Sequence, residues 1–391
     1  MDSEPSVKVL RAIPELEEIR EVWESWPGNR DSEMLSYSTF VRTNPGTVRP
    51  HVLAVYREGR PDAILVGRID KGEISCRVGY LGVGFGARIM CFVTGALRGN
   101  PSEENCELLV NEVLRSLSRG EADAACLYFL KRGSELWRLA RRKPSLLCRD
   151  YICTTQKHFA AALPASVEEF YRGLSPGSRW QARSKHKRLL KDFAGEVRIR
   201  CFRDAAELES LVQDLELVAK KSYQRGIGVG FIDTPETREQ LRFKAERGWL
   251  RAYVLYIADR PCAFWMGDLN ESTFGSDYLA YDAEFEKYSP GMCLIIKVME
   301  GFCDGNREGI TEVDFATGFA QYKKVLSNRE WEEESVFIFA SSVKGISLNL
   351  IRTFFSGIDQ AAKKALVSTN LLQRIKKRWR THARAKQTTE S

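Results

Sequence analysis

The spacing of apolar residues changes between helical and strand periods along the chain and predicts helices and strands in mixed order. Apolar positions recur at helical spacing over 14–26, 106–118 and 208–224, which predicts amphipathic helices there. Short runs rich in β-branched and aromatic residues predict strands, and four of these strands form two hairpins, over 51–68 and 249–270. This mixture predicts an α/β (α+β) fold in which mixed central sheets are flanked by helices.

The two hairpins lie at corresponding places in two similar series of elements. Each hairpin is followed by aromatic strands, a helix and another strand. A chain of 391 residues is also longer than one ordinary domain. We therefore predict two domains of the same kind, over 1–165 and 166–344, followed by a basic helical segment over 345–391.

The stretch from Ser276 to Gly318 predicts a strand, a turn, an apolar helix and a second strand. The first strand covers 278–281, and the turn contains Pro290 and Gly291. The first N–H groups of a helix have no acceptor within it, and together with the helix dipole they favour an anion, most often a phosphate. Pro290 suits the first helical turn, and Gly291 lets a ligand approach the backbone. Alternatively, this turn does no more than begin the helix.

Charge and cysteine usage narrow the class of protein. The net charge of +7 indicates affinity for anions in general and not for nucleic acid in particular. The ten cysteines are scattered, without a Cys-x-x-Cys motif or a His/Cys cluster, which favours reduced thiols over a disulfide framework or a zinc site. We expect no metal. The N-terminus lacks the apolar segment of a signal peptide, and no run approaches ~18 apolar residues, so we expect a cytoplasmic protein.

The residues around the turn resemble the acyl-CoA N-acyltransferase (GNAT) superfamily. Within it they are similar to the CelD-like branch, linked to cellulose and exopolysaccharide synthesis, and to the related Fem aminoacyltransferases. The resemblance is carried by Tyr281, the turn Tyr288-Ser289-Pro290-Gly291 with Leu294, the pair Asp314-Phe315, Gly318, and the pair Tyr322-Lys323. It has motif support over 170–340 and rests on the pattern of elements alone over 1–160.

The resemblance implies a co-substrate and a place for it. In the superfamily, the turn after the fourth strand binds the pyrophosphate of CoA, and the fourth and fifth strands separate around the pantetheine arm. The co-substrate is then acetyl-CoA or another acyl-CoA. The common turn reads Gln/Arg-x-x-Gly-x-Gly/Ala, whereas this chain has Tyr288 and Cys293 at the first and last positions, as the CelD-like branch generally does.

Acyl transfer from a thioester to an amine needs a base, a donor to the oxyanion, an acid for the thiolate and a grip on the phosphates. Tyr322 is the candidate acid, because many members of the superfamily use a tyrosine after the fifth strand. Asp314 is the candidate base, or else it orients Lys323. A backbone N–H of strand 278–281 is expected to polarise the carbonyl, and Tyr281 at its end is a further catalytic candidate.

The co-substrate is predicted to contact the turn and one cation beyond it. The predicted residues are Tyr288, Ser289, Gly291, Met292 and Lys323. The structural alternatives are that Asp314 caps a turn, that Tyr322 belongs to the core and that Lys323 is solvated.

Two basic segments add candidate binding surfaces. Arg179, Arg183 and Lys187 fall at helical spacing after Pro176 and predict a face that binds the phosphates of CoA, a nucleotide-sugar or tRNA. The alternative is a solvated cationic helix. Residues 371–386 contain seven Lys or Arg and no acid, which is typical of contact with an anionic membrane or nucleic acid, or of a solvated tail.

The sequence thus predicts an acyltransferase that moves an acyl group, in the simplest case acetyl, from CoA to an amine on a sugar or polysaccharide precursor. One alternative is a Fem-like transferase that uses aminoacyl-tRNA, which the basic helix favours. Another is an inactive GNAT-fold binding module in polysaccharide synthesis. Its basic tail would contact a polysaccharide synthase or the inner face of the membrane.

Overall fold

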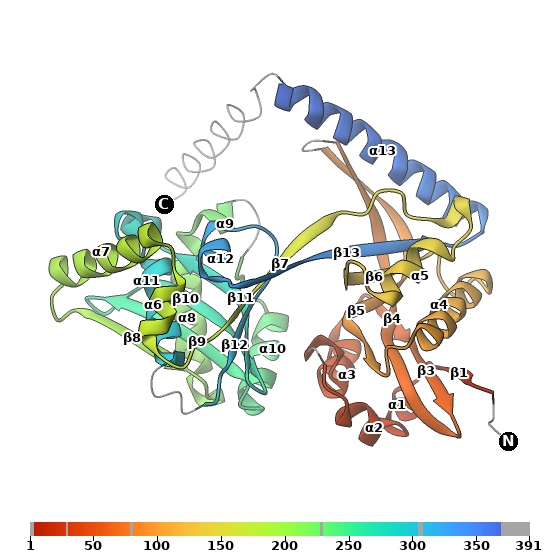
Figure 1. Ribbon diagram of the computed structural model, residues 1–391, viewed down its shortest axis with the longest axis horizontal. Coiled ribbons are helices and arrows are strands. Elements are labelled where there is room, and N and C mark those ends of the chain that lie inside the picture. The colour runs from red at the N-terminus through yellow and green to blue at the C-terminus, as the bar shows by residue number, and fades with distance from the viewer. Residues whose placement is uncertain (1–3, 29, 79–80, 227–229, 304–307, 369–391) are drawn as a thin grey trace. The chain divides into compact units, whose positions relative to one another are not determined.

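The computed structural model describes the chain except for residues 1–3, 29, 79–80, 227–229, 304–307 and 369–391 (Figure 1). Its described residues form two compact units. The first contains the chain up to Gln156 and the segment that begins at Trp331, and the second contains Lys157–Glu330. The chain therefore enters the second unit once and returns to the first. The domain boundaries expected at 165/166 and 344/345 stay predictions, and the basic segment 371–386 lies outside the described residues.

The sheet of the first unit has the strand order β1-β3-β4-β5-β6-β13, and β2 pairs with β4. Its strands are β1 (Ser6–Leu10), β2 (Thr47–Pro50), β3 (Val52–Arg57), β4 (Arg60–Val78), β5 (Leu81–Gly99), β6 (Ala124–Lys131) and β13 (Arg329–Phe339). All these pairs are antiparallel except β5 and β6, which run parallel. The hairpin predicted over 51–68 is confirmed by the pairing of β3 with β4.

Helices cover both faces of this first sheet. They are α1 (Ile13–Glu17), α2 (Arg20–Ser25), α3 (Met34–Thr43), α4 (Glu103–Ser118), α5 (Glu135–Arg142) and α13 (Val343–Ser368), with short 3-10 turns η1 (Arg30–Ser32) and η2 (Leu146–Cys148). The helix expected over 14–26 is two short helices, α1 and α2. Trp23 lies in the main core and donates its indole N–H to the carbonyl of Ser32 at 2.8 Å. A smaller core with Phe339 packs against Leu348 of α13.

The sheet of the second unit has the strand order β7-β12-β11-β10-β9-β8. Its strands are β7 (Thr155–Ala162), β8 (Val197–Phe202), β9 (Leu250–Ile257), β10 (Arg260–Asn270), β11 (Thr273–Tyr281) and β12 (Glu312–Thr317). Every residue of β9 is buried, which explains its continuous apolar run, because both faces of the strand are covered. The hairpin predicted over 249–270 is confirmed by the pairing of β9 with β10.

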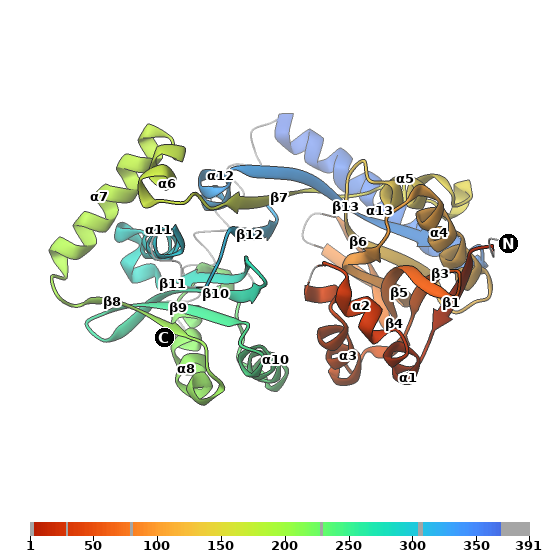
Figure 2. The ribbon, with the colours of Figure 1, turned by 60° about the horizontal axis from the view of Figure 1, so that its bottom comes forward.

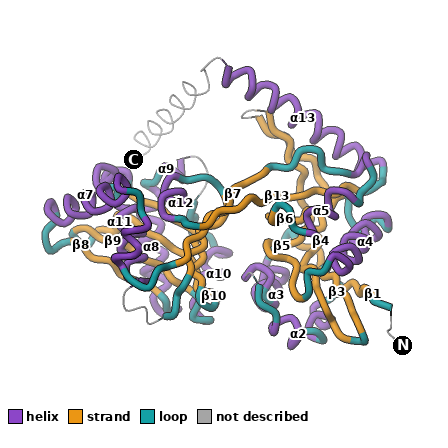
Figure 3. Tube along the Cα trace, in the orientation of Figure 1, coloured by secondary structure: helices purple, strands orange, loops and turns teal. Residues whose placement is uncertain are grey.

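The helices of the second unit lie on both sides of its sheet (Figure 2). They are α6 (Val167–Gly173), α7 (Pro176–Asp192), α8 (Leu208–Lys220), α9 (Tyr223–Gly226), α10 (Pro235–Glu246), α11 (Pro290–Cys303) and α12 (Gln321–Leu326), with 3-10 turns η3 (Ala205–Glu207) and η4 (Ala283–Tyr288). α11 packs on one face over a core that contains Trp265 and Phe274. α8 and α10 cover the other face around Phe202 and Phe264. Figure 3 shows this alternation of helix and strand. The predicted α/β fold is confirmed.

Two strands of the second sheet run side by side for only part of their length. β11 and β12 are parallel, and their pairing covers the three pairs from Thr273–Glu312 to Gly275–Asp314. Beyond Gly275, β11 continues to Tyr281 beside β10 alone. The resemblance implies two neighbouring strands that separate around a ligand. β11 and β12 separate in this way.

A bulge and a glycine produce this separation. Opposite the β10 residues Met266 and Gly267, β11 places Tyr278 and Ser276, so that Asp277 is the extra residue of a bulge. A Cβ atom on Gly267 would lie 1.8 Å from the carbonyl oxygen of Gly275, a distance that no side chain tolerates. Glycine at 267 thus lets the two backbones approach where β11 bends away from β12.

Candidate active site

The gap between β11 and β12 is lined by aromatic and hydroxyl side chains. Trp265 donates its indole N–H to the hydroxyl oxygen of Ser276 at 2.8 Å, and its ring stacks on Phe315 at 6.2 Å between centroids. Phe315 in turn meets the ring of Tyr322 edge-on at 6.0 Å. Tyr322 comes from α12, which follows β12 directly. The chain turns after β12 and forms α12, and this turn places the Tyr322 phenol beside the gap.

The surroundings of Tyr322 keep its hydroxyl protonated. Burial raises the pKa of Tyr322 to about 12, the neighbouring phenol of Tyr223 adds to the rise, and a hydrogen bond with Ser276 opposes it. A phenol with this pKa carries its proton at neutral pH and can deliver it to a leaving group. The predicted acid thus lies at the strand separation with its proton in place.

The free edge of β11 offers backbone groups to this gap. The carbonyl of Leu279 accepts a hydrogen bond of 2.6 Å from Nε2 of Gln224, a residue of α9, so it does not face β10. In a strand, the N–H and C=O of one residue point to the same side, so the N–H of Leu279 also faces the gap. The Leu279 N–H therefore has the direction that the predicted polarisation of a carbonyl needs, and that role stays a prediction.

The turn before α11 has the form of an anion site. Ser289 is in the left-handed conformation, with φ 53° and ψ 54°, and its carbonyl accepts the N–H of Cys293 at 3.0 Å. Pro290 has no N–H, so the N–H groups of Gly291 and Met292 are the ones at this helix start without an acceptor four residues earlier. A Cβ atom on Gly291 would lie 3.4 Å from the ring of Tyr281, which covers the turn from β11.

The side chain of Tyr288 points away from the turn. It is buried, donates its hydroxyl to Oδ2 of Asp192 at 2.9 Å and meets the ring of Phe193 at 5.4 Å. Arg188 lies over the same ring at 5.6 Å. The position that holds Gln or Arg in the common turn therefore serves here to fix α7. Only the backbone of Tyr288 remains for a ligand.

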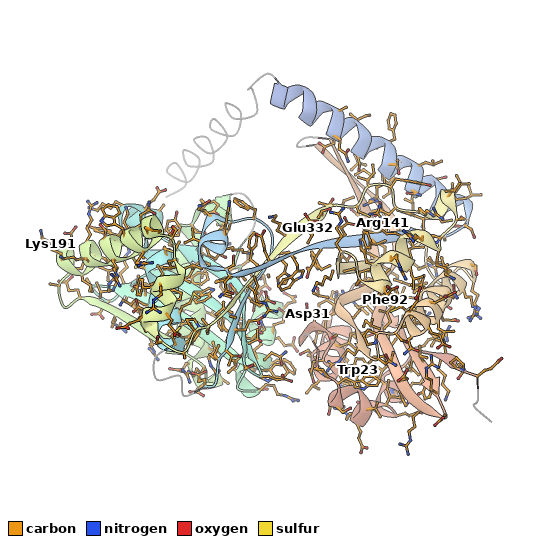
Figure 4. All side chains as sticks on the ribbon, viewed as in Figure 1. Trp23, Asp31, Phe92, Arg141, Lys191 and Glu332 are labelled. Atoms are coloured by element: carbon orange, nitrogen blue, oxygen red, sulfur yellow. The ribbon has the colours of Figure 1, made fainter. Side chains whose placement is uncertain are left out.

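The structure does not bring the three predicted phosphate-binding residues of α7 to the turn. Arg179, Arg183 and Lys187 line one side of a surface groove of about 470 Å³ together with Trp180. Successive residues of an α-helix are rotated by 100°, so this face of α7 lies opposite to Asp192. Asp192 accepts the hydrogen bond from Tyr288, just before the turn. Arg179 donates to the carbonyls of Arg172 and Leu174, and the guanidinium of Arg183 lies 4.7 Å from the ring centre of Tyr171. Figure 4 places Lys191 near the end of this helix.

Lys185 of α7 contacts the residue just before the turn, and the sequence did not single it out. Its ammonium group donates to the carbonyl of Lys287 at 2.9 Å, just before the turn. It also acts electrostatically on the buried thiol of Cys293, whose pKa burial raises to about 11. Nothing in the run of basic residues 183–191 shows which face packs, so only tertiary contacts identify Lys185.

Asp314 and Lys323 both lie near the end of β12, each with its own hydrogen-bond partners. Oδ1 of Asp314 accepts the N–H of Ala316 at 2.7 Å and lies 2.6 Å from Nε2 of His158. Lys323 donates to the carbonyl of Thr317 at 2.8 Å. Burial lowers the pKa of Lys323, and the charge of Asp314 opposes this. Because neighbouring side chains of a strand alternate, Asp314 lies on the opposite face of β12 from Phe315 and its partner Tyr322.

Comparison with known proteins identifies the domain that carries this geometry. Residues 176–324 match the model of the acetyltransferase (GNAT) domain. This segment is a GNAT acetyltransferase domain. It lies within the second unit, and the match supports N-acyltransferase activity of the GNAT type for that unit. A GNAT domain implies acyl-CoA as the co-substrate.

Solved structures resemble this chain in fold. One described as the crystal structure of FemX is 12% identical, with a TM-score of 0.52, and the match covers 83% of this chain and 96% of that one. A conserved protein of unknown function from Bacteroides thetaiotaomicron is 10% identical, with a TM-score of 0.51, over 85% of this chain and 100% of that one. At such identities the likeness concerns the fold alone. No curated protein matches the sequence significantly.

Two further observations bear on the GNAT domain and its surroundings. Among the described residues, no group of three or more His, Cys, Asp or Glu side chains is placed to hold a metal ion. In the same part of the chain, no helix combines the length and apolarity needed to cross a bilayer. The residues of the gap that the sequence did not indicate are Ser276, Tyr223 and Gln224, which carry no motif and meet only through the fold.

Proposed function

We propose that the second unit transfers an acyl group, in the simplest case acetyl, from CoA to an amine. The observation that carries this proposal is the separation of β11 from β12 at Gly275 and Asp314, with the Tyr322 phenol and the Leu279 N–H both at the gap. The separation gives a thioester a passage through the sheet, and the two groups supply what its cleavage needs.

The donor is bound at two places in this proposal. Its pyrophosphate lies at the N–H groups of Gly291 and Met292, with the ammonium of Lys185 nearby. Its pantetheine arm follows the free edge of β11. The N–H of Leu279 then donates to the thioester carbonyl and stabilises the oxyanion that forms when the amine attacks.

The acid and the base act from opposite faces of β12. The carbonyl carbon gains a bond to nitrogen and loses its bond to sulfur, and Tyr322 gives its proton to the departing thiolate. The proton lost by the amine goes to Asp314, whose Oδ1 is already held by His158 and the N–H of Ala316. Transfer through a gap between two strands requires this arrangement, because donor and acceptor approach from different sides.

Titration of the full chain with acetyl-CoA by calorimetry tests the donor site. We expect a dissociation constant on the order of micromolar, and its loss in Gly291→Glu, which places bulk and negative charge in the turn. Gly301→Glu is the matched control, because Gly301 lies on the same helix and a Cβ atom there meets nothing within 4 Å. Absence of binding by the wild type up to millimolar concentration would exclude CoA as the donor.

The acceptor amine is proposed to belong to a sugar or polysaccharide precursor. This part rests on the resemblance to the CelD-like branch. Screening amino sugars against simple alkylamines, with release of free CoA as the readout, tests it directly. A clear preference for alkylamines would contradict it.

Aminoacyl-tRNA is the second candidate donor, because of the groove on α7. There Trp180 is 69% exposed beside Arg179, Arg183 and Lys187, an arrangement that suits stacking of a nucleobase next to phosphates. Binding of tRNA that weakens steeply with salt and disappears in Trp180→Ala would favour this donor. If neither CoA nor tRNA binds, the remaining proposal is an inactive GNAT-fold binding module.

A further inference from the structure

The first unit repeats the strand separation of the second. β5 and β6 run parallel up to the pair Phe92–Leu127, and their pairing ends there. Beyond this pair, β5 bulges away from β4 over residues 93–96, where Gly95 has a φ of 64°. Both units therefore open their sheets in the same way, with a parallel pair of strands that ends at a bulge.

A pocket of about 270 Å³ lies where β5 leaves β6. Its walls come from α3, η1 and the strands β4, β5 and β6, all within the first unit, and Figure 4 labels Asp31 and Phe92 in this region. The lining residues are Asp31, Ser36, Tyr37, Phe40, Arg68, Val93, Thr94 and Tyr128, which we call the first-unit pocket. Its volume is below the usual range for drug-sized ligands, so it suits a smaller molecule.

Arg68 is a fixed donor in the wall of the first-unit pocket. Its Nε donates to Oδ2 of Asp70 at 2.8 Å, and its guanidinium lies 4.3 Å from the ring centre of Phe40. Among the described residues, its two terminal amino groups have no hydrogen-bond partner. An arginine whose plane is already held loses little entropy when those groups bind a ligand.

Hydroxyl groups surround this arginine. The side chains of Ser36 and Thr94 make no hydrogen bond to any described residue, and the hydroxyl of Tyr128 lies 3.9 Å from Sγ of Cys91, a weak contact. Asp70 pairs with Arg68 and offsets its charge, so the attraction of the pocket for an anion is reduced. The groups that converge here both donate and accept hydrogen bonds.

The first unit lacks the phosphate grip of the second. The turn before α4 corresponds in order to the turn before α11, yet the first turn of α4 contains Glu103 and Glu104, which repel an anion. The Asn105 side chain donates to Asp62 at 2.7 Å and to the carbonyl of Asn100 at 3.0 Å, so this turn is closed by its own residues. A second CoA molecule is therefore not the ligand.

We propose that the first-unit pocket binds one neutral, hydroxyl-rich ring, that is, a monosaccharide unit. Sugar hydroxyls both donate and accept, which suits the terminal amino groups of Arg68 and the hydroxyls of Ser36 and Thr94. The proposal is independent of the donor used by the second unit, because each lining residue belongs to the first.

Saturation-transfer NMR on the full chain with glucose and N-acetylglucosamine tests the proposal. A ring of this size should bind with a dissociation constant on the order of 1 mM. Thr94→Val and Ser36→Ala each remove one hydroxyl, and each should weaken binding about three- to tenfold. Thr43→Val makes the same change as Thr94→Val at an exposed position of α3 outside the pocket, so this control variant should bind as the wild type does.

Three results would overturn the proposal. The first is absence of binding of both sugars by the wild type at about ten times that concentration. The second is unchanged affinity in both pocket variants, which would place the sugar elsewhere, for example in the second unit. The third is tighter binding of glucuronate or glucose 6-phosphate than of glucose, which would show that the pocket selects an anion. Arg68→Lys distinguishes binding of a neutral sugar from binding of an anion. The substitution keeps the positive charge but removes the planar pair of donors, so only sugar binding should weaken.

Discussion

Gln224 and Leu279 are joined by a hydrogen bond in which Nε2 of the glutamine donates to the backbone carbonyl oxygen at 2.6 Å. The bond connects α9 to the free edge of β11, where a further strand would pair if β12 had not separated. Oε1 of Gln224 is buried and accepts no hydrogen bond from the described residues. A buried acceptor without a donor is unfavourable, so this oxygen suits an amide N–H of the pantetheine arm.

Gln224→Leu should therefore weaken the binding of acetyl-CoA by about three- to tenfold, the effect of one neutral hydrogen bond. Calorimetry would measure this against adenosine 3′,5′-bisphosphate, which lacks the pantetheine arm and should bind equally well to variant and wild type. Gln213→Leu, on the exposed side of α8, is the control. Tighter binding of acetyl-CoA by Gln224→Leu would mean that the glutamine obstructs the gap.

Tyr322→Phe tests the acid. The substitution keeps the ring that packs on Phe315 and removes only the hydroxyl, so the fold and the affinity for acetyl-CoA should be unchanged. We expect kcat to fall by about a hundredfold or more, the usual contribution of a positioned acid. Because burial raises the pKa of Tyr322 to about 12, its acid form persists throughout the neutral and moderately alkaline range. The assignment would be contradicted if kcat of the wild type declined near pH 9 because Tyr322 lost its proton there.

The sequence predicted the order of elements well and the orientation of side chains poorly. The βαβ unit over 276–318 could be predicted from the spacing of its apolar residues, because a strand and a helix bury residues at different intervals. Asp314 and Tyr322 lie on opposite faces of β12. This depends on which residues of β12 face each side of the sheet and on how α12 folds back against Phe315, and the local sequence shows neither. For the same reason the spacing of the basic residues of α7 indicated the shared face of Arg179, Arg183 and Lys187, a binding face that stays a prediction, but could not show that Lys185 contacts the residue before the turn.

His51 should make the first unit sensitive to acid. Its side chain is fully buried, and burial lowers the pKa of His51 to about 4, with the charge of Arg49 adding to the effect. The folded protein then keeps His51 neutral while the unfolded chain binds a proton below its ordinary pKa near 6.5. The unfolded state therefore gains protons first, and stability falls as the pH decreases from 6.5 towards 4.

Urea unfolding at several pH values would measure this, and His51→Gln should remove the His51 contribution to the slope. The full effect is up to about 3 kcal/mol, since one pKa unit corresponds to about 1.4 kcal/mol. The range between pH 6.5 and 5 is the informative one. At lower pH the carboxylate of Glu121, whose pKa is lowered by Arg11 and Arg49 despite its partial burial, begins to contribute as well. An unchanged slope in His51→Gln would refute the assignment to this histidine.

Gly267→Ala tests whether the strand separation depends on one close backbone contact. A methyl group at this position would lie 1.8 Å from the carbonyl oxygen of Gly275, so β10 and β11 must move apart where the bulge begins. We expect a loss of about 1–3 kcal/mol in the free energy of unfolding, as for overpacking in a tight core. Acetyl-CoA affinity should fall as well, because the same residues set the angle at which β11 leaves β12.

The control for this substitution is Gly301→Ala, which adds the same methyl group where nothing lies within 4 Å. In a helix interior, alanine is favoured over glycine by about 1 kcal/mol, so this variant should be as stable as the wild type or more so. If Gly267→Ala loses stability but binds acetyl-CoA unchanged, the glycine serves packing only. The width of the gap would then depend on the bulge at Asp277 alone, and insertion or deletion at that residue becomes the decisive change.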